Sequence, residues 1–553
     1  MDSTTRPRKL IPDSLRSYNL HKVSQLDQDI TTILMSIRKW RNSLVPINRL
    51  PEDVLSLVPT YLFHQSDRLR ATFVCLHWRR TFLQRADLWS KLITWKGEEY
   101  TEAILGRSKE TTLDVSIGGR VPADVDPLLS PHIRRIGCLD FVCNKWVDIQ
   151  KFSEINTGPL PLLYTLDINV NVENGPEDFG VITPSLPLFS NAMHLKEFYF
   201  YSDTKRSPPI NHFIFPSLVL FDFSVRPSEG FHVSPLLDFL EASPTLRTIH
   251  VRITANMSLE DVPLGRVVIL PNVETFDLTV TDGGPGYKLA AHISCPSARH
   301  TTITQKDEDP EQAFPTSDLW DAIIRQYTRS SAEEVTLDLR TFLVFTCKLT
   351  FRSPDTTVIE LNYTIDLYGE NGDEYDQRTL EALEDVFTKA TLVLRNHPQL
   401  AIVKCLNICH SFQPFLDTFP TTIPHIANET GRLFKALGSL DELTIYRCDI
   451  RPYFHSFLDV PEDDITEPVV FPPIKQLTIS HPVDSSDGQC LRAIVGLAKS
   501  QHALGIPFER VIIYRENMPM GMEEGLRPWV GSVEHRDDMS HGQWGLPQLE
   551  LVA

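Results

Sequence analysis

A short pattern recurs from about residue 105 to residue 516: an apolar residue, two others, a second apolar residue, one other and a third apolar residue. Clear copies are "LYTLDI" (163–168), "LKEFYF" (195–200), "LRTIHV" (246–251) and "IKQLTI" (474–479). With the fourth residue of each copy as a marker, the first eight markers lie 23 to 32 residues apart, at 113, 139, 166, 198, 221, 249, 276 and 301. Later markers are at 335, 406, 443, 477 and 511. A repeat of this length with one short strand per unit is typical of an α/β solenoid, whose units bury their apolar faces only by stacking.

The regular spacing breaks within a region from 341 to 399. Two runs in which apolar and mostly polar residues alternate, 343–351 and 359–367, are joined by "RSPDTTV". Such runs predict a β-hairpin or a pair of neighbouring strands. Apolar residues at helical spacing from Leu380 to Leu394 then predict an amphipathic helix. We expect this elaborated region to interrupt the array, and the tail at 517–553, rich in Gly, Pro and Met, to be loosely ordered.

The N-terminal part has a different pattern. Residues 1–19 are polar with two prolines and predict a disordered tail. Residues 20–45 predict a helix, because apolar residues recur alternately three and four positions apart over three heptads. These residues are Val23, Leu26, Ile30, Ile33, Ile37, Trp40 and Leu44. Two interpretations stay open: the helix docks on the domain that follows it, or it self-associates as a coiled coil.

Residues 47–95 are rich in apolar and aromatic residues and predict a small helical domain. Pro51, Glu52 and Asp53 fit the first turn of a helix, where proline loses no useful donor and acids suit the positive end of the helix dipole. A second helix is predicted over about 67–84. Its apolar residues are expected to share one face. They are Leu69, Phe73, Val74, Trp78 and Phe82.

Composition excludes several classes of function. The chain has 553 residues and a net charge of −19, which disfavours binding to nucleic acid or to anionic membranes because both need a basic face. No stretch of 18 apolar residues and no signal peptide is present, and the nine cysteines form no CxxC pair. We therefore expect a protein of the cytosol or nucleus with reduced thiols.

Motifs for catalysis are missing from the sequence. It has no phosphate-binding glycine loop, no HExxH and no GxSxG, so no catalytic or cofactor-binding residue is predicted and the chain is not expected to be an enzyme. "CLNICH" (405–410) brings two cysteines and a histidine together, but we interpret the thiols as buried strand residues and predict no metal site. An unrecognised enzymatic site in the region 341–399 is kept as a separate hypothesis.

The segment 47–92 resembles the F-box of fungal, particularly basidiomycete, F-box proteins. The shared elements are Leu50-Pro51-Glu52, Val54-Leu55, Val74-Cys75, Trp78-Arg79 and Leu88-Trp89, in this order. The downstream units resemble leucine-rich repeats. "LYTLDINVN" ends at Asn171, "IGCLDFVCN" at Asn144 and "LDELTIYRC" at Cys448, as that repeat requires, whereas the other units lack the final Asn or Cys.

These resemblances imply a fold and a function. They imply an α/β protein with a small helical F-box domain followed by a leucine-rich-repeat-like solenoid. The F-box would bind a Skp-type adaptor, and through it a cullin, as the substrate-recognition subunit of a ubiquitin ligase, while the array binds an unknown protein substrate. By resemblance, the adaptor-binding residues are Leu50, Pro51, Val54, Leu55 and Trp78.

Trp78 is also expected to contribute to the core of the small domain. One residue departs from the F-box pattern: Pro59 stands where a helix-compatible residue is usual. Because an interior proline costs roughly 3 kcal/mol, either the first helix ends near Val58 or adaptor affinity is reduced. The alternative function is therefore an interaction scaffold that assembles no active ligase.

Overall fold

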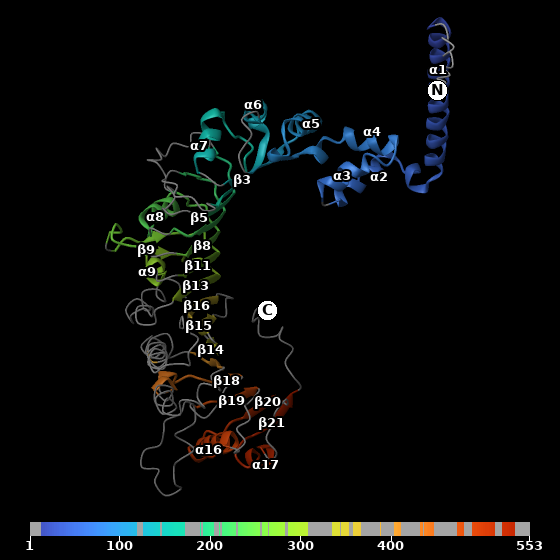
Figure 1. The fold of residues 1–553 in the computed structure, drawn as a ribbon. Coiled ribbons are helices and arrows are strands. Elements are labelled where there is room, and N and C mark those ends of the chain that lie inside the picture. Colours follow the sequence, from blue (N-terminus) through green and yellow to red (C-terminus); the bar gives the residue numbers. More distant parts are fainter. Residues whose placement is uncertain are drawn as a thin grey trace, which may run out of the picture. The chain divides into compact units, whose positions relative to one another are not determined.

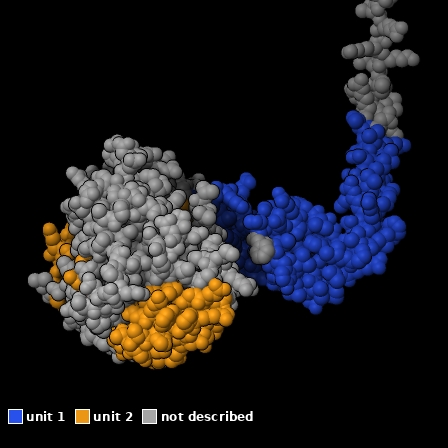
Figure 2. Space-filling model, turned by 90° about the horizontal axis from the view of Figure 1, so that it is seen from below, with its two compact units in different colours: residues 1–139 blue, residues 140–553 orange. Residues whose placement is uncertain are grey.

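The computed structural model describes two compact units, residues 1–139 and residues 140–553, which Figure 2 colours blue and orange. The structure describes residues 13–62, 64–118, 125–143, 146–156, 158–171, 189, 192–203, 210, 213–227, 230–254, 257–263, 265–281, 286–307, 334–342, 344–352, 358–366, 388, 403–410, 432–434, 436–446, 473–480, 489–514 and 522–536. The chain is an α/β protein with a helical N-terminal region and a large parallel sheet.

The first unit begins with the long helix α1 (Asp13–Leu44). The helix starts earlier than the sequence predicted, because residues 13–19, assigned to a disordered tail, are helical. Its first residue, Asp13, places an acid at the positive end of the helix dipole. Residues 1–12 lie outside the described part of the chain.

A small helical bundle follows α1, and we use this name for residues 46–89. It consists of η1 (Pro46–Arg49), α2 (Glu52–Leu55), η2 (Val58–Tyr61), α3 (Gln65–Ala71), α4 (Leu76–Gln84) and η3 (Ala86–Trp89). Its core holds Leu55, Phe82, Leu88 and Trp89, all almost fully buried. The Trp89 indole N–H donates to the carbonyl oxygen of Phe82 at 3.0 Å, which joins η3 to α4.

The single helix predicted over 67–84 is wrong, because the chain forms α3 and α4 with a break at Thr72–Cys75. The Thr72 hydroxyl donates to the carbonyl oxygen of Leu69, and Cys75 adopts an extended backbone as the N-cap of α4. The break separates the apolar residues that were expected to share one face. Trp78 and Phe82 are buried, whereas Leu69, Phe73 and Val74 are exposed.

The rest of the first unit is a short α/β segment. It contains β1 (Lys91–Ile93), η4 (Thr94–Lys96), α5 (Glu98–Ser108), β2 (Leu113–Gly118), α6 (Val125–Leu129) and η5 (Ser130–Arg135). β1 and β2 pair in parallel, and Gly97 supplies the positive φ of 98° from which α5 begins. β3 (Ile136–Cys143) contains the boundary between the two units.

The second unit is built on a ladder of strands that lie side by side (Figure 1). Paired neighbours follow the order β4, β5, β6, β8, β11, β13, β16, β15, β14, β17, β18, β19, β20, β21. All these pairs are parallel except β15 with each of its neighbours. Their bounds are β4 (Thr165–Asn171), β5 (Glu197–Asp203), β6 (Leu220–Val225), β8 (Thr248–Thr254), β11 (Thr275–Thr281), β13 (His300–Asp307), β14 (Glu334–Phe342), β15 (Val344–Arg352), β16 (Val358–Asp366), β17 (Cys405–His410), β18 (Glu442–Tyr446), β19 (Gln476–Ser480), β20 (Arg510–Tyr514) and β21 (Val533–Arg536).

The marker residues of the sequence pattern occupy one register across this ladder. Leu166 pairs with Phe198, which in turn pairs with Phe221. The same row continues through the markers 249, 276 and 301, then through Ile359 and Phe351 to the markers 335, 406, 443, 477 and 511. The pattern therefore located the strands and their alignment.

The paired strands predicted in the region 341–399 are present as β15 and β16, which form an antiparallel pair. The sequence did not predict that β14 pairs with β15 as well. As a result, β16 and β15 lie between β13 and β14 in the ladder. The amphipathic helix predicted from Leu380 to Leu394 lies outside the described residues, apart from Thr388.

Helices and short strands border the ladder. α7 (Trp146–Ile155), α8 (Ser234–Glu241) and α9 (Gly286–Ala291) precede or follow early strands, and α16 (Gln489–Ala503) and α17 (Met522–Leu526) flank β20. Figure 1 shows α8 and α9 on one side of the strands. Two further sheets pair β7 (Phe231–His232) with β9 (Met257–Ser258) and β10 (Val268–Ile269) with β12 (Ile293–Ser294).

Phenylalanine rings fill the core beneath the early strands. Phe198 lies within 6.1 Å, between ring centroids, of Phe200, Phe213, Phe215, Phe221 and Phe239. Burial alternates along β5, β6, β8 and β11, as expected for strands that present one face to a core.

Candidate functional site

Asn48 joins the start of the helical bundle to α4. Its side-chain oxygen accepts a 2.6 Å hydrogen bond from the indole N–H of Trp78, and Cys75 Sγ lies 3.8 Å from the same oxygen. Since Trp78 is almost buried, this bond satisfies a donor that would otherwise lack a partner. Asn48 belongs to η1 and lies two residues before Leu50. The contact therefore places the loop between α3 and α4 beside η1.

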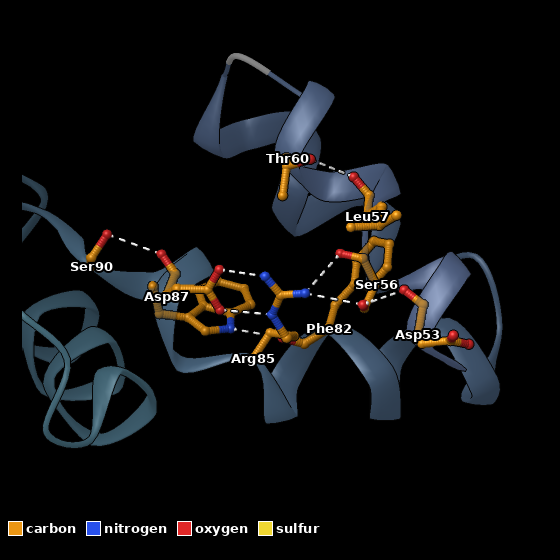
Figure 3. Close-up of polar contacts among 9 residues, drawn as sticks. Asp53, Ser56, Leu57, Thr60, Phe82, Arg85, Asp87 and Ser90 are labelled. Atoms are coloured by element: carbon orange, nitrogen blue, oxygen red, sulfur yellow. Dashed lines mark hydrogen bonds and ion pairs between the residues drawn. The ribbon is translucent and has the colours of Figure 1, made fainter. Parts of the chain in front are cut away.

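Arg85 makes the second connection, at the other end of α4 (Figure 3). Its Nη1 donates to the hydroxyl and the carbonyl oxygen of Ser56, just after α2, at 3.0 and 3.3 Å. Its Nε and Nη2 bind the two carboxylate oxygens of Asp87 at 2.7 and 2.6 Å. The segment 48–56 therefore runs alongside α4 in the same direction.

The ion pair between Arg85 and Asp87 shifts the pKa values of both groups toward their charged forms. The hydrogen bond from Arg85 lowers the pKa of the Asp87 carboxyl group, although partial burial opposes this effect. The same hydrogen bond raises the pKa of Arg85. Both groups are thus held in their charged forms, and the bidentate geometry fixes the end of α4.

The five residues predicted to bind an adaptor fall into two groups. Leu50 is half-buried, Pro51 is exposed, and the side chain of Val54 is 41% exposed, so these three are available to a partner. Leu55 is 0% exposed and Trp78 is 8% exposed, and both lie in the core of the bundle. In this structure Leu55 and Trp78 therefore support the surface from beneath.

Pro59 occupies a position where a proline does not disrupt the helix. The α-helical part of the first helix ends at Leu55, and Pro59 lies in the first turn of η2, where a missing N–H costs little. Pro59 is buried. The helix thus ends before the proline, which is the first of the two outcomes that the sequence left open.

The sequence did not single out several exposed apolar side chains as surface residues. Phe73, Val74 and Leu76 surround the break between α3 and α4, and the side chain of Phe73 is 67% exposed. Leu57 and Tyr61 are exposed on and beside η2. Phe73 and Val74 lie in the break between the two helices, so the periodicity of a single predicted helix did not identify them as surface residues.

A groove of about 590 Å³ lies between α1 and the start of α4. Arg38, Lys39, His77 and Arg80 line it, together with polar side chains and the apolar Met35 and Leu76. None of the described residues that line it is a carboxylate. The groove is therefore suited to an anionic group or to an acidic segment of a partner.

Carboxylates gather on the outer face of the parallel strands in the second unit. The residue after each marker points away from the core. Across five paired strands, these residues are Asp167, Tyr199, Asp222, His250 and Asp277, in one register. We call this set, together with Asp140 on β3, the acidic row; all six side chains are half-exposed.

The charges of the acidic row act on one another. Partial burial and the neighbouring carboxylates of Asp140 and Asp222 raise the pKa of Asp167 from 3.8 to about 6. His250 binds Asp277 at 2.7 Å, and this hydrogen bond raises the pKa of His250. A cationic side chain placed over Asp167 would relieve the repulsion between these carboxylates.

The described residues hold no cluster of three or more His, Cys, Asp or Glu side chains that could bind a metal ion. Within this part of the chain, no helix is long and apolar enough to cross a bilayer. Comparison of the sequence with protein-family models and with curated proteins finds no match.

Proposed function

We propose that the chain is the substrate-recognition subunit of a Skp-cullin-F-box ubiquitin ligase. In this proposal the helical bundle is an F-box that binds a Skp-type adaptor. One observation supports it most: the chain holds Leu50, Pro51 and Val54 at the surface, over a core formed by Leu55 and Trp78. Exposed apolar side chains on a well-packed small domain are typical of a binding surface.

The proposed adaptor surface extends to the α3–α4 loop. Asn48 contacts both Trp78 and Cys75, so the exposed Phe73, Val74 and Leu76 belong to a segment that adjoins η1. Aromatic and aliphatic side chains at the centre of an interface contribute most of its binding energy. We therefore propose Phe73 as a further adaptor contact.

The proposed role of the second unit is to bind the protein target. We propose that its strands belong to a leucine-rich-repeat-like solenoid, which is supported by marker spacings of 23 to 32 residues and by the common register of the markers. The outer strand face would carry the target. Because that face bears the acidic row, a target segment rich in Lys or Arg is the best electrostatic match.

The adaptor interaction can be tested by co-purification with a Skp-type adaptor. Val54→Asp places a charge in the proposed interface, and Ile269→Asp is its matched control, because Ile269 is an exposed apolar residue in the second unit. We expect the native chain and the control to retain the adaptor and Val54→Asp to lose at least tenfold in affinity. A native chain that captures no Skp-type adaptor would refute the proposal.

The alternative function is a scaffold that binds partners without an active ligase. Pro59 is the feature that keeps this alternative, because it falls in the 3-10 turn η2 that follows the four α-helical residues of α2, where the F-box pattern has a helix-compatible residue. A reconstitution with adaptor, cullin and RING subunit distinguishes the two functions. Cullin in the complex supports the ligase subunit, and adaptor without cullin supports the scaffold.

A further inference from the structure

α1 has an apolar stripe that the described part of its own chain leaves exposed. We call it the apolar seam: Val23, Leu26, Ile30, Ile33, Ile37, Trp40 and Leu44. The side chains of the seam are between 47% and 64% exposed. A helical stripe of seven large apolar residues in water is unusual for a protein that stays monomeric.

The polar side of α1, and not the seam, faces the helical bundle. Ser36, Lys39, Asn42 and Ser43 line the groove beside α4, and the apolar Met35, which is not part of the seam, lines it as well. The backbone carbonyl oxygens of Asn42 and Ser43 accept hydrogen bonds from the side chains of Asn48 and Arg49, at 2.8 and 3.1 Å. Of the two interpretations left open by the sequence, docking of the seam on the following domain is therefore not observed.

We infer that the seam of α1 pairs with the same seam of a second copy of this chain, as an antiparallel two-helix coiled coil. This inference goes beyond the proposed function and does not depend on it. The spacing of alternately three and four residues is the one that keeps two helices in contact along their length. The seam covers 23–44, about 33 Å of helix, which allows six layers of side chains in the antiparallel alignment.

Leu34 favours the antiparallel orientation. It is exposed and lies beside the seam, one residue after Ile33. If Ile33 packs against Ile37 of the second copy, the two Leu34 side chains meet at the midpoint of the pair. In a parallel pair, Leu34 would instead lie against Asp29 of the other copy, which would bring a carboxylate onto an apolar surface.

The charges of α1 favour the same orientation. Its first half carries Asp27 and Asp29, and its last part carries Arg38, Lys39 and Arg41. Antiparallel pairing places Asp27 of each copy opposite Arg41 of the other, at the positions that flank a coiled-coil seam. Parallel pairing would also give Asp27 an opposite charge, Lys22 of the other copy, but it would bring the basic residues Arg38, Lys39 and Arg41 of the two helices together.

The mass of the full chain in solution tests the pairing. By sedimentation equilibrium at tens of micromolar, we expect twice the 63.0 kDa of the monomer. Ile33→Asp/Ile37→Asp should give the monomer mass. Ser24→Asp/Thr31→Asp is the matched control, because it adds the same charges to the opposite face of α1 and should remain a dimer. A monomeric native chain, or equal loss of the dimer in both variants, would overturn the inference.

Charge reversal tests the orientation. Arg41→Asp should weaken the dimer by roughly fivefold, because two carboxylates then face each other at each end. Asp27→Arg/Arg41→Asp should restore the native dissociation constant, since the attraction is recreated in reverse. In a parallel pair Asp27 would face Lys22, so the double variant would stay weakened, and that result would overturn the antiparallel arrangement. Helical content by circular dichroism shows in each case that α1 still forms.

Discussion

The strands of the second unit and the helix α1 both carry a regular apolar pattern, yet only the strands bury it within the chain. In β5, Phe198 and Phe200 point into a core of phenylalanine rings. In α1, the apolar seam faces solvent while polar residues face the neighbouring helical bundle. In these two regions, periodicity predicts which residues share a face, but not what covers that face.

The largest expected effect contrasts the two regions directly. Phe198→Ala removes a ring that touches five others and should lower the free energy of unfolding by roughly 3–5 kcal/mol. Ile33→Ala, in a chain dilute enough to be monomeric, should cost less than about 1 kcal/mol, because Ile33 is exposed there. Denaturant unfolding measures both. Similar losses at the two positions would show that the α1 seam is buried in the monomer.

The next effect concerns the connection between η1 and α4. Asn48→Ala leaves the indole N–H of the nearly buried Trp78 without its partner and should cost roughly 1–3 kcal/mol. In a Trp78→Phe background, which removes the donor, the same substitution should cost much less. The free energies of unfolding of the native protein, the two single variants and the double variant, measured by chemical denaturation, form a double-mutant cycle. Additive losses would mean that the hydrogen bond contributes nothing.

The acidic row should make the second unit sensitive to pH. The pKa of Asp167 is raised on folding from 3.8 to about 6, so this group favours the folded state fully below about pH 4 and loses that contribution as pH rises through 6. Asp167→Asn should therefore stabilise the protein at pH 8, by roughly 1 kcal/mol after allowance for solvent screening, and not at pH 4. Thermal unfolding at the two pH values checks this. An equal change at both would contradict the repulsion within the row.

The smallest effect is expected at the Arg85–Asp87 pair. The pKa of Asp87 is lowered on folding, so its contribution is present above the ordinary carboxyl pKa of 3.8 and is lost as pH falls through the lowered value. Because both side chains are partly exposed, Asp87→Asn should cost less than about 1 kcal/mol at pH 7 and nothing at pH 2. Unfolding of the variant at several pH values measures this. A loss that persists at pH 2 would indicate that the carboxylate acts by packing instead of by charge.

The candidate site was only partly predictable from the sequence. All five residues were expected at or near a partner. Leu50, Pro51 and Val54 are accessible, whereas Leu55 is buried in the bundle, and so is Trp78, which was also expected in the core. The apolar pattern of a short segment does not distinguish residues that face the core from residues that face a partner, so it could not separate the two groups. Phe73 and Val74 are exposed at a break between two helices, and the spacing of apolar residues did not predict that break.

The sequence alone determined the positions of the strands, since an apolar pattern of period two defines a buried face and its repetition sets the register of Leu166, Phe198 and Phe221. It also determined that α1 would have one apolar stripe. Only the tertiary structure decided the direction of that stripe, the order in which β15 and β16 enter the ladder, and the assembly of the acidic row. These features depend on contacts between residues far apart in the chain, and local spacing carries no information about such contacts.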